Sequence, residues 1–315
     1  MKVWPRLPAF LERQISLSDL VYFELDLLND DVNRKILDCQ QLSHGEHLKE
    51  QLPEQLYRRL KTFFRTKRNE VNDKVFFDLL TKNWKVKRLI WVCFMISFLI
   101  ENDGYYRIPT VDNLINQRAA LLHKTVRSIE TVDDQCKPVN SLDSKQVIQL
   151  LSLTLDAFDE TAQSNLIKPG NLTKKADSLR KQKSPTDLLI EKYKCGQLNI
   201  ELGALLEQEL KDYDTQSNLS LNDESKNRTS GDKIATVMEK MESINRFFQK
   251  QLIEKRNKKM TETIRKELKR NADSNMLFVI GAAHFLGPNS ILKILEVKHG
   301  YQTEKVDIRN IPNPM

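Results

Sequence analysis

The stretch that decides the fold is "NMLFVIGAAHFLGPNSILKILEVKHGYQTEKVDI", residues 275–308. An apolar run of strand length breaks at Gly281, a turn follows, and apolar residues then recur at helical spacing as far as Gly300. We predict a buried strand, a turn, a helix and a final strand. A helix that follows a strand in this way implies a sheet with parallel or mixed pairing, because parallel strands need a crossover connection.

A lone histidine, His284, stands just past the predicted strand. Gly281 tolerates backbone angles that other residues avoid, and the two alanines that follow it let neighbouring backbone come close. Open sheets place their sites in the crevice outside the carboxyl ends of the strands, and we expect the imidazole to project there. The spacing alone also fits a structural histidine, so both interpretations stay open.

Residues 19–28, "DLVYFELDLL", predict a short strand near the amino terminus. β-Branched and aromatic residues nearly alternate there with Glu24 and Asp26, which indicates a strand whose end carries carboxylates. Apolar residues three and four apart predict helices over 53–122, from Asp143 onward, and over 233–271. The sequence therefore predicts an α/β fold in which many helices surround a small mixed central sheet.

The chain has the size and composition of a globular protein, with 315 residues of which 40% are hydrophobic and 30% charged. We predict a single domain over 1–315. Two polar stretches broken by Pro or Gly, at about 159–186 and 212–232, are expected to be mobile insertions. They contain three candidate glycosylation sequons, at Asn171, Asn218 and Asn227.

Charge and hydropathy indicate a globular protein with a solvated surface rather than a membrane-spanning one. The 50 basic and 43 acidic residues are mixed along the chain, so the net charge of +7 indicates a solvated surface. The longest apolar run, residues 89–100, is shorter than the roughly 20 residues of a spanning helix and predicts a buried helix. Pro5, Pro8 and Glu12 interrupt the apolar core that a signal peptide needs. We expect neither a signal peptide nor a transmembrane segment in this chain.

The four cysteines are widely spaced, and no CxxC pair indicates a zinc or redox site. Cys93 lies within the apolar run and is predicted to be a buried thiol. The others are Cys39, Cys136 and Cys195. A disulfide between two of these three would require an oxidising compartment.

Other candidate sites have simpler interpretations. His44 and His47 flank Glu46, but without the HExxH spacing that puts two imidazoles on one helical face. His123 and His299 follow predicted helix ends, where an imidazole can interact with the helix dipole. The segment 250–270 is rich in Lys and Arg, but glutamates interrupt it, so we expect a solvated helix face and no nucleic-acid partner.

Residues 255–306, which begin with "KRNKKM" and contain "FVIGAAHFLG", resemble the carboxyl-terminal core of the TIKI metalloproteases, in the TraB/PrgY/Tiki group. In that family a "KRN" helix leads into a strand and a Gly-x-x-His motif. Further segments look like TIKI counterparts in the same order, namely "VYFELDL" (21–27), "CQQLSHGEHLKEQLPEQLYRRLK" (39–61), "NWKVKRLIWVCFMI" (83–96) and "DDQCKPVNSLDSKQVI" (133–148). The resemblance therefore covers most of the chain and implies a TraB/ChaN-like core.

The resemblance implies a metal-dependent peptidase, active with Mn²⁺ or Co²⁺, that cleaves the amino-terminal region of Wnt proteins and negatively regulates Wnt signalling. It assigns catalytic roles to Glu24, Arg256 and His284, with Glu24 and His284 also as metal ligands and Gly281 as the first residue of the Gly-x-x-His motif. It also implies a secreted protein or one held at the membrane or cell surface, through a segment that is absent from this chain.

One family feature is missing from this sequence. In the family, a strand with a first Gly-x-x-His motif precedes a stretch like "VWPRLPAFLERQ", residues 3–14 here, and this chain starts at Met1. Two explanations stay open. A gene-model truncation could have removed the motif, or the chain could be a catalytically incomplete relative that acts as a protein-binding module.

Overall fold

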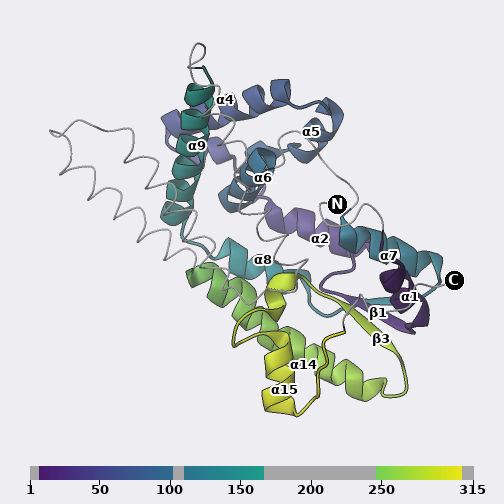
Figure 1. Ribbon diagram of the computed structural model, residues 1–315. Helices are drawn as coiled ribbons and strands as arrows, with labels where there is room; N and C mark the ends of the chain where they lie inside the picture. The colour runs from purple at the N-terminus through teal and green to yellow at the C-terminus, as the bar shows by residue number, and fades with distance from the viewer. Residues whose placement is uncertain (1–6, 102–109, 167–245, 307–315) are drawn as a thin grey trace, which may run out of the picture. The chain divides into compact units, whose positions relative to one another are not determined.

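The computed structural model describes residues 7–101, 110–166 and 246–306 (Figure 1). It divides into two compact units. The first, which we call the sheet unit, comprises Met1–Asn29, Pro109–Gln135 and Asp177–Met315. The second, which we call the helical unit, comprises Asp30–Ile108 and Cys136–Ala176. The organisation as a single domain stays a prediction.

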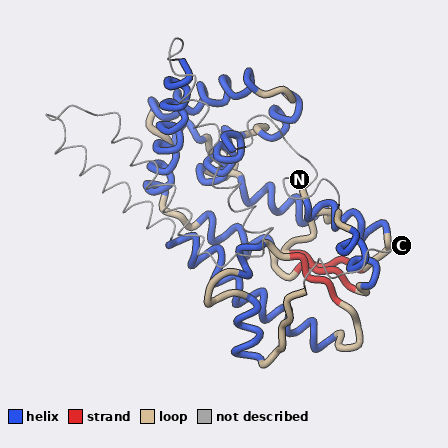
Figure 2. The backbone as a smooth tube through the Cα atoms, viewed as in Figure 1, coloured by secondary structure: helices blue, strands red, loops and turns tan. Residues whose placement is uncertain are grey.

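The sheet unit is built on three parallel strands in the order β2-β1-β3 (Figure 2). The strands are β1 (Leu20–Phe23), β2 (Thr125–Ser128) and β3 (Met276–Val279). The predicted α/β fold with a small sheet among helices is confirmed, and the strands within the described residues all pair parallel. Strand β2 was not predicted. Residues 301–306, by contrast, form no strand, so the expected final strand is wrong over those positions.

The central strand β1 is buried on both faces, and its side chains alternate between two cores. Leu20 and Tyr22 pack on one face against α14 and α15, and Val21 and Phe23 pack on the other face against α1 and α7. A strand covered on both faces reads as a continuous apolar run, as "LVYF" does. The sheet is therefore the middle layer between two layers of helices.

Two of the four helices described in the sheet unit begin at a residue whose side chain caps them, Thr110 and Ser290. The four helices are α1 (Ala9–Leu17), α7 (Val111–Leu121), α14 (Lys255–Arg270) and α15 (Ile291–His299), with the π-helical turn η2 (Gln249–Glu254) before α14 and the 3-10 turn η3 (Ala282–Phe285) after β3. The Ser290 hydroxyl accepts a hydrogen bond from the Lys293 N–H, and Gly300 ends α15 in the left-handed region. The predicted stop at Gly300 is confirmed.

The helical unit is a bundle around α6 (Leu89–Glu101), the segment predicted to be buried. Val92, Ile96 and Leu99 on this helix are wholly buried, which confirms that prediction. The remaining elements are α2 (Asp30–Gln40), α3 (Leu48–Gln51), α4 (Glu54–Glu70), α5 (Lys74–Leu80), η1 (Trp84–Val86) and α9 (Ser144–Leu166). Helix α8 (Val132–Asn140) has residues in both units. Within the described residues, no helix is both long and apolar enough to cross a bilayer.

Helix α9 starts as predicted but continues further. The sequence predicts a polar insertion from about residue 159, whereas the helix runs to Leu166. The remainder of that insertion, the whole of the second one, and the sequons at Asn171, Asn218 and Asn227 fall outside the described residues.

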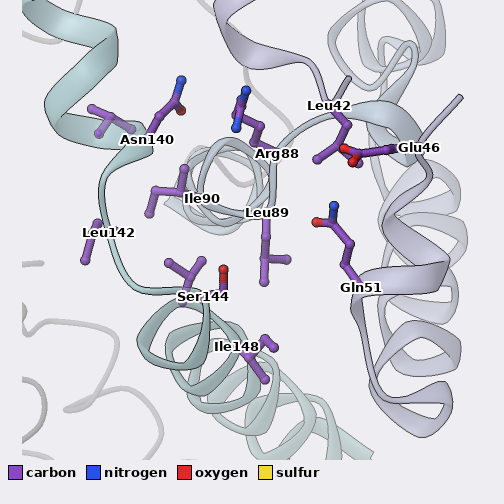
Figure 3. A pocket seen from close by; sticks show the side chains of 12 residues that line it. Leu42, Glu46, Gln51, Arg88, Leu89, Ile90, Asn140, Leu142, Ser144 and Ile148 are labelled. Carbon is purple, nitrogen blue, oxygen red and sulfur yellow. The ribbon is translucent and has the colours of Figure 1, made fainter. Parts of the chain in front are cut away.

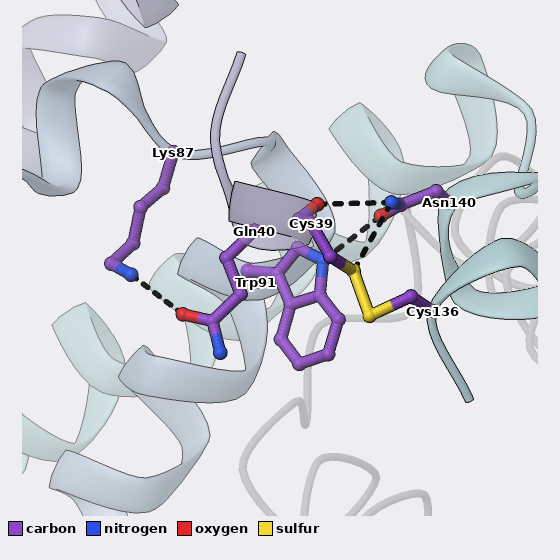
Figure 4. Close-up of a disulfide and its surroundings, with 6 residues drawn as sticks. All are labelled: Cys39, Gln40, Lys87, Trp91, Cys136 and Asn140. Atoms are coloured by element: carbon purple, nitrogen blue, oxygen red, sulfur yellow. Dashed lines mark hydrogen bonds between the residues drawn. A yellow bond between two sulfur atoms is a disulfide. The ribbon is translucent and has the colours of Figure 1, made fainter. Parts of the chain in front are cut away.

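A disulfide joins Cys39 on α2 to Cys136 on α8, within the helical unit (Figure 4). The Asn140 amide lies beside it, donating from Nδ2 to the Cys39 carbonyl oxygen at 3.0 Å and accepting from the Trp91 indole N–H at 2.9 Å. Cys93 is a free, buried thiol, as predicted, and burial raises its pKa to about 12. Cys195 lies outside the described residues.

A buried polar cluster ties β1 to the end of α14. The Tyr22 hydroxyl donates to Glu267 Oε2 at 2.6 Å, and Arg127 and Arg270 each reach the same carboxylate at 3.0 Å. Burial, reinforced by the charge and hydrogen bond of Glu267, raises the pKa of Tyr22 to about 12. The Tyr22 hydrogen bond is the main reason that the pKa of Glu267 is lowered, although burial opposes it. Folding therefore favours the ionised carboxylate.

We expect the Cys39→Ser, Cys136→Ser double variant to lose about 2–4 kcal/mol of unfolding free energy in the helical unit, because the disulfide closes a long loop in the unfolded chain. The 97-residue sequence separation of the two cysteines places the expected loss toward the upper end of that range. Urea denaturation followed by circular dichroism measures the loss. Wild type should lose the same amount when dithiothreitol is added, and the double variant should not respond. Equal stability of the two proteins without reductant would contradict the pairing.

We expect Glu267→Gln to lower the unfolding free energy by about 1–3 kcal/mol near neutral pH, since it removes a buried hydrogen-bonded charge. The pKa of Glu267 is lower in the folded state, so its contribution is complete above the usual carboxyl pKa of about 4.3 and is lost as the pH falls through the folded value. The stability difference between wild type and variant, measured by urea denaturation from pH 7 to 3, should shrink on acidification. A constant difference would contradict the assignment.

Candidate metal and catalytic site

The carboxyl ends of the three strands bring acidic and imidazole side chains to one edge of the sheet. Glu24 follows β1 directly, Glu130 comes two residues after β2, and His284 lies on the η3 turn after β3. The backbone pairing continues past the strands, because the Glu130 N–H donates to the Glu24 carbonyl oxygen at 3.2 Å. Parallel strands end at a common edge, and this is the edge at which open sheets place their sites.

Arg256, in the first turn of α14, connects the two carboxylates. Its Nη2 lies 2.7 Å from both Glu24 Oε2 and Glu130 Oε2, and its Nε lies 3.1 Å from Glu130 Oε1. The Glu130 side chain has no exposed area and the Arg256 side chain is 13% exposed. Burial alone would lower the pKa of Arg256, but the hydrogen bonds and charges of Glu130 and Glu24 raise it above its usual value. Arg256 is therefore a permanent positive charge held by two carboxylates.

The η2 turn and helix α8 complete this arrangement. Arg256 Nη1 donates to the Leu252 carbonyl oxygen in η2 at 3.1 Å, so every nitrogen of the guanidinium has a partner. The Gln135 amide, on α8, donates to Glu130 Oε2 at 3.2 Å and to Glu24 Oε2 at 3.4 Å. These contacts leave Glu24 Oε1 as the carboxylate oxygen that faces away from the guanidinium.

Glu24 Oε1 faces the Gly-x-x-His segment. It accepts the Gly281 N–H at 2.8 Å and lies 3.8 Å from His284 Nε2. A Cβ at position 281 would come within 3.0 Å of this oxygen, so a side chain there would press on the carboxylate. Gly281 has φ −59° and ψ 138°, which other residues also adopt. The sequence analysis was therefore wrong about the reason for this glycine, which is close approach rather than unusual backbone angles.

Asn257, next to Arg256 on α14, fixes the imidazole of His284. The amide nitrogen donates to the Asn289 carbonyl oxygen at 2.7 Å, which leaves Oδ1 to face His284 Nδ1 at 2.5 Å. An amide oxygen can only accept, so Nδ1 carries the proton and Nε2 carries a lone pair. This is the orientation found in metal-binding histidines, whose second ring nitrogen donates to an oxygen of the protein.

The electrostatics of this arrangement favour a cation. Burial lowers the pKa of His284 to about 4, Glu24 acts in the opposite sense and Arg256 in the same sense, so the ring is neutral near pH 7. A lone pair of Nε2 therefore faces a carboxylate oxygen of Glu24, and two carboxylates outnumber one guanidinium. The gap of 3.8 Å is shorter than two metal–ligand bonds of about 2.1 Å each, so one ion can contact both atoms.

The donor pair thus fits a divalent ion, although it is only part of a ligand set. In the part of the chain that the structure describes, no group of three or more His, Cys, Asp or Glu side chains is arranged to hold a metal. His284 is only 4% exposed, so the ring is buried against α14 rather than projecting into an open crevice as predicted. The expected proximity of Glu24, Arg256 and His284 is what the structure shows, and their catalytic and metal-binding roles stay predictions.

The other candidates lie outside this arrangement of Glu24, Arg256 and His284. Asp26 Oδ1 accepts the Asn116 amide at 2.9 Å and the Leu28 N–H at 3.1 Å, which orders the turn after β1. His299 lies 3.4 Å from Glu262, as an imidazole near the end of α15. His44 and His47 are exposed residues of the helical unit, and His123 has a positive φ of 52°. Basic residues of α14 pair with acids, as in Lys259–Asp134 and Arg265–Glu262.

Sequence reasoning missed Glu130, Gln135 and Asn257. Glu130 had a detectable signal, because "TVRSIE" (125–130) ends in a glutamate after β-branched residues, much as "LVYFE" (20–24) does. Asn257 stands within the "KRN" segment that was singled out for its arginine. Gln135 follows no pattern that indicates a role.

We expect Arg256→Met to lower the unfolding free energy by about 3–5 kcal/mol, because it leaves the buried Glu130 carboxylate without its countercharge. Arg265→Met is the matched control, since this arginine lies on the same helix and pairs with the partly exposed Glu262, and it should have little effect. Chemical denaturation of both variants measures the difference. Equal losses would show that the shared guanidinium does not hold this edge of the sheet together.

Known proteins resemble this chain along nearly its whole length. A protein named Metalloprotease TIKI homolog from Nematostella vectensis is 30% identical over 97% of this chain and 62% of its own length. Metalloprotease TIKI2 from Danio rerio is 31% identical over 96% of this chain and 55% of its own length. Metalloprotease TIKI1 from Homo sapiens is 28% identical over 96% of this chain and 57% of its own length.

The chain therefore spans little more than half the length of these relatives. No solved structure matches it. The sequence pattern of the TraB/PrgY/gumN family matches residues 2–305, and the chain belongs to that family.

Proposed function

We propose that this protein is a metal-dependent peptidase of the TIKI type, which cleaves the amino-terminal region of Wnt proteins and negatively regulates Wnt signalling. The observation that carries the proposal is the pairing of His284 Nε2 with Glu24 Oε1 at 3.8 Å, with the imidazole proton held on the opposite nitrogen by Asn257. The names of the relatives support the reaction class, since each is called a metalloprotease. The choice of Wnt as substrate rests on the family resemblance.

His284 and Glu24 would hold the divalent ion. One imidazole nitrogen and one carboxylate oxygen suit Mn²⁺ or Co²⁺ without selecting sharply between them. Such an ion polarises the scissile carbonyl and lowers the pKa of a bound water, which supplies the nucleophile of a metallopeptidase. The Gly281 N–H holds Glu24 Oε1 at 2.8 Å, so the carboxylate cannot turn away from the imidazole without losing that bond.

Arg256 has two roles in this proposal. It orients Glu24 by binding Oε2 at 2.7 Å, which leaves Oε1 for the ion. It also supplies a fixed positive charge close to the place where negative charge would develop on the substrate carbonyl. Glu130 binds the other edge of the guanidinium and acts as a positioning residue for it.

We also propose that the protein works outside the cytosol, secreted or held at the membrane or cell surface. The Cys39–Cys136 disulfide supports an oxidising compartment, because such bonds rarely persist in the cytosol. Membrane attachment rests on the family resemblance alone.

We expect His284→Ala to abolish both Mn²⁺ binding and Mn²⁺-dependent cleavage of a synthetic peptide from a Wnt amino terminus. Calorimetry with MnCl₂ measures binding, and mass spectrometry of the peptide measures cleavage. Glu24→Gln should weaken binding as well, because it removes the charge that faces the ion. His44→Ala is the matched control, since it removes an exposed imidazole of the helical unit and should change neither result.

The outcomes separate the two functions considered for this chain. Cleavage by wild type that His284→Ala removes supports the peptidase. Mn²⁺ binding that depends on His284 but gives no cleavage would instead favour the catalytically incomplete, protein-binding alternative. Cleavage that persists in His284→Ala would refute the site assignment.

A further inference from the structure

The helical unit contains a cavity of about 330 Å³ that is unrelated to the edge of the sheet (Figure 3). Its lining residues come from the segment around α3, from the start of α6 and from the region between α8 and α9, all within this unit. A volume of this size lies at the lower end of the range for sites that bind small molecules.

The cavity has an apolar floor and a polar rim. Buried aliphatic side chains form the floor, among them Ile90, Val139 and Val147. Exposed polar residues stand at the rim, namely Glu46, Gln51 and Ser144. In Figure 3, Arg88 lies on the opposite side of the opening from Ser144 and Ile148. The lining is therefore amphipathic, with its one cationic side chain across from the start of α9.

Arg88 is the unusual member of this lining. Its side chain is partly buried, and its Nε is fully buried with no hydrogen-bond partner. Across the described residues, no carboxylate lies within ion-pair distance of its guanidinium, which contrasts with the fully partnered Arg256. The two terminal nitrogens of Arg88 also have no partner among the described residues but are not enclosed, so the guanidinium presents a positive charge to the cavity that no carboxylate of the described residues neutralises.

The surroundings of Arg88 are fixed. The Asn140 amide, which also lines the cavity, uses both its nitrogen and its oxygen in bonds to Cys39 and Trp91, next to the disulfide. The backbone N–H of Arg88 donates to the Gln40 carbonyl oxygen at 2.8 Å, and this bond anchors the start of α6 to the end of α2. The cavity wall is thus preformed rather than assembled on binding.

We propose that this cavity is a binding site for a small aliphatic carboxylate. Arg88 would bind the carboxylate through its two terminal nitrogens, Nη1 and Nη2, since the edge of the planar guanidinium that they form matches carboxylate geometry. The aliphatic floor would bury the hydrocarbon part of the ligand. A carboxylate on an aliphatic chain occurs both in a fatty acid and at a peptide carboxyl terminus, and the site as described accepts either.

The charges around the cavity favour a ligand with a single negative charge. Arg88 is the only arginine or lysine among the lining residues that the structure describes, so a polyphosphate would lack the several cations that it needs. Glu46 carries the opposing charge, but it is exposed at the rim and its Oε2 accepts the Ser43 N–H at 3.2 Å. Its negative charge would repel a second anionic group of the ligand at the entrance, and its side chain would not occupy the apolar floor.

The test is a titration of the whole 315-residue chain with octanoate, followed by NMR of isotopically labelled isoleucine and leucine methyl groups. We expect octanoate to shift the methyl signals of Ile90 and Ile148, and octanol to bind more weakly. Arg88→Met keeps the aliphatic stem and should weaken octanoate binding by about tenfold or more while leaving octanol unchanged. Lys85→Met, an exposed neighbour outside the cavity lining, is the matched control and should change neither.

A second variant keeps the proposal falsifiable if Arg88→Met fails to fold. Ile148 is a half-buried residue of the cavity lining, and in the Ile148→Trp variant the larger side chain would fill the cavity. This variant should therefore weaken the binding of octanoate and of octanol alike. A short peptide that ends in leucine with a free carboxylate is titrated in the same way, and its affinity is compared with that of octanoate. Tighter binding of the peptide assigns the site to a peptide terminus, and tighter binding of octanoate assigns it to a fatty acid. Binding of neither, or octanoate binding that is unaffected in both variants, would overturn the proposal.

Discussion

The sharing of one guanidinium by two carboxylates is the interaction on which the site edge of this sheet depends. Arg256 brings α14 against the ends of β1 and β2, and it can do so because Glu24 and Glu130 follow within two residues of the ends of these adjacent parallel strands. Taking three charges out of water is costly, and the cost is offset only when the hydrogen bonds are nearly complete. Here every nitrogen of the guanidinium has a partner, and the one carboxylate oxygen that it leaves uncovered is the one turned toward His284.

A second consequence of this geometry is that two neighbouring residues on α14 orient the two donors separately. Arg256 sets the direction of Glu24, and Asn257 sets the direction of the imidazole. The two donors that face each other are therefore both oriented from one turn of one helix. A rotation of that turn would disturb both donors together.

Much of this arrangement could be predicted from the sequence, and the failures have physical causes. β3 was predicted because it belongs to an apolar run of strand length that breaks at Gly281, and β1 was predicted from the near alternation of β-branched and aromatic residues with Glu24 and Asp26. β2 was missed because "TVRS" is short and half polar, at the edge of the sheet, and Glu130 was missed with it. His284 and Glu24 were noticed at the ends of predicted strands, whereas their roles, and Arg256, came from the family resemblance. The role of Asn257 depends on a hydrogen-bond direction that no sequence pattern encodes. Gly281 was singled out for the wrong reason, because the closeness of Glu24 is a tertiary fact.

The order of the strands has a consequence for synthesis on the ribosome. The central strand β1 emerges first, but 232 positions separate Glu24 from Arg256 and 257 separate it from Gly281. The helical unit, by contrast, is made of segments that end near residue 176 and can bury its apolar side chains much earlier. β1 can pair with β2 once residue 128 has been translated, but its other edge stays unpaired until β3 follows at residues 276–279, a long delay of the kind that makes non-local sheets slow to form.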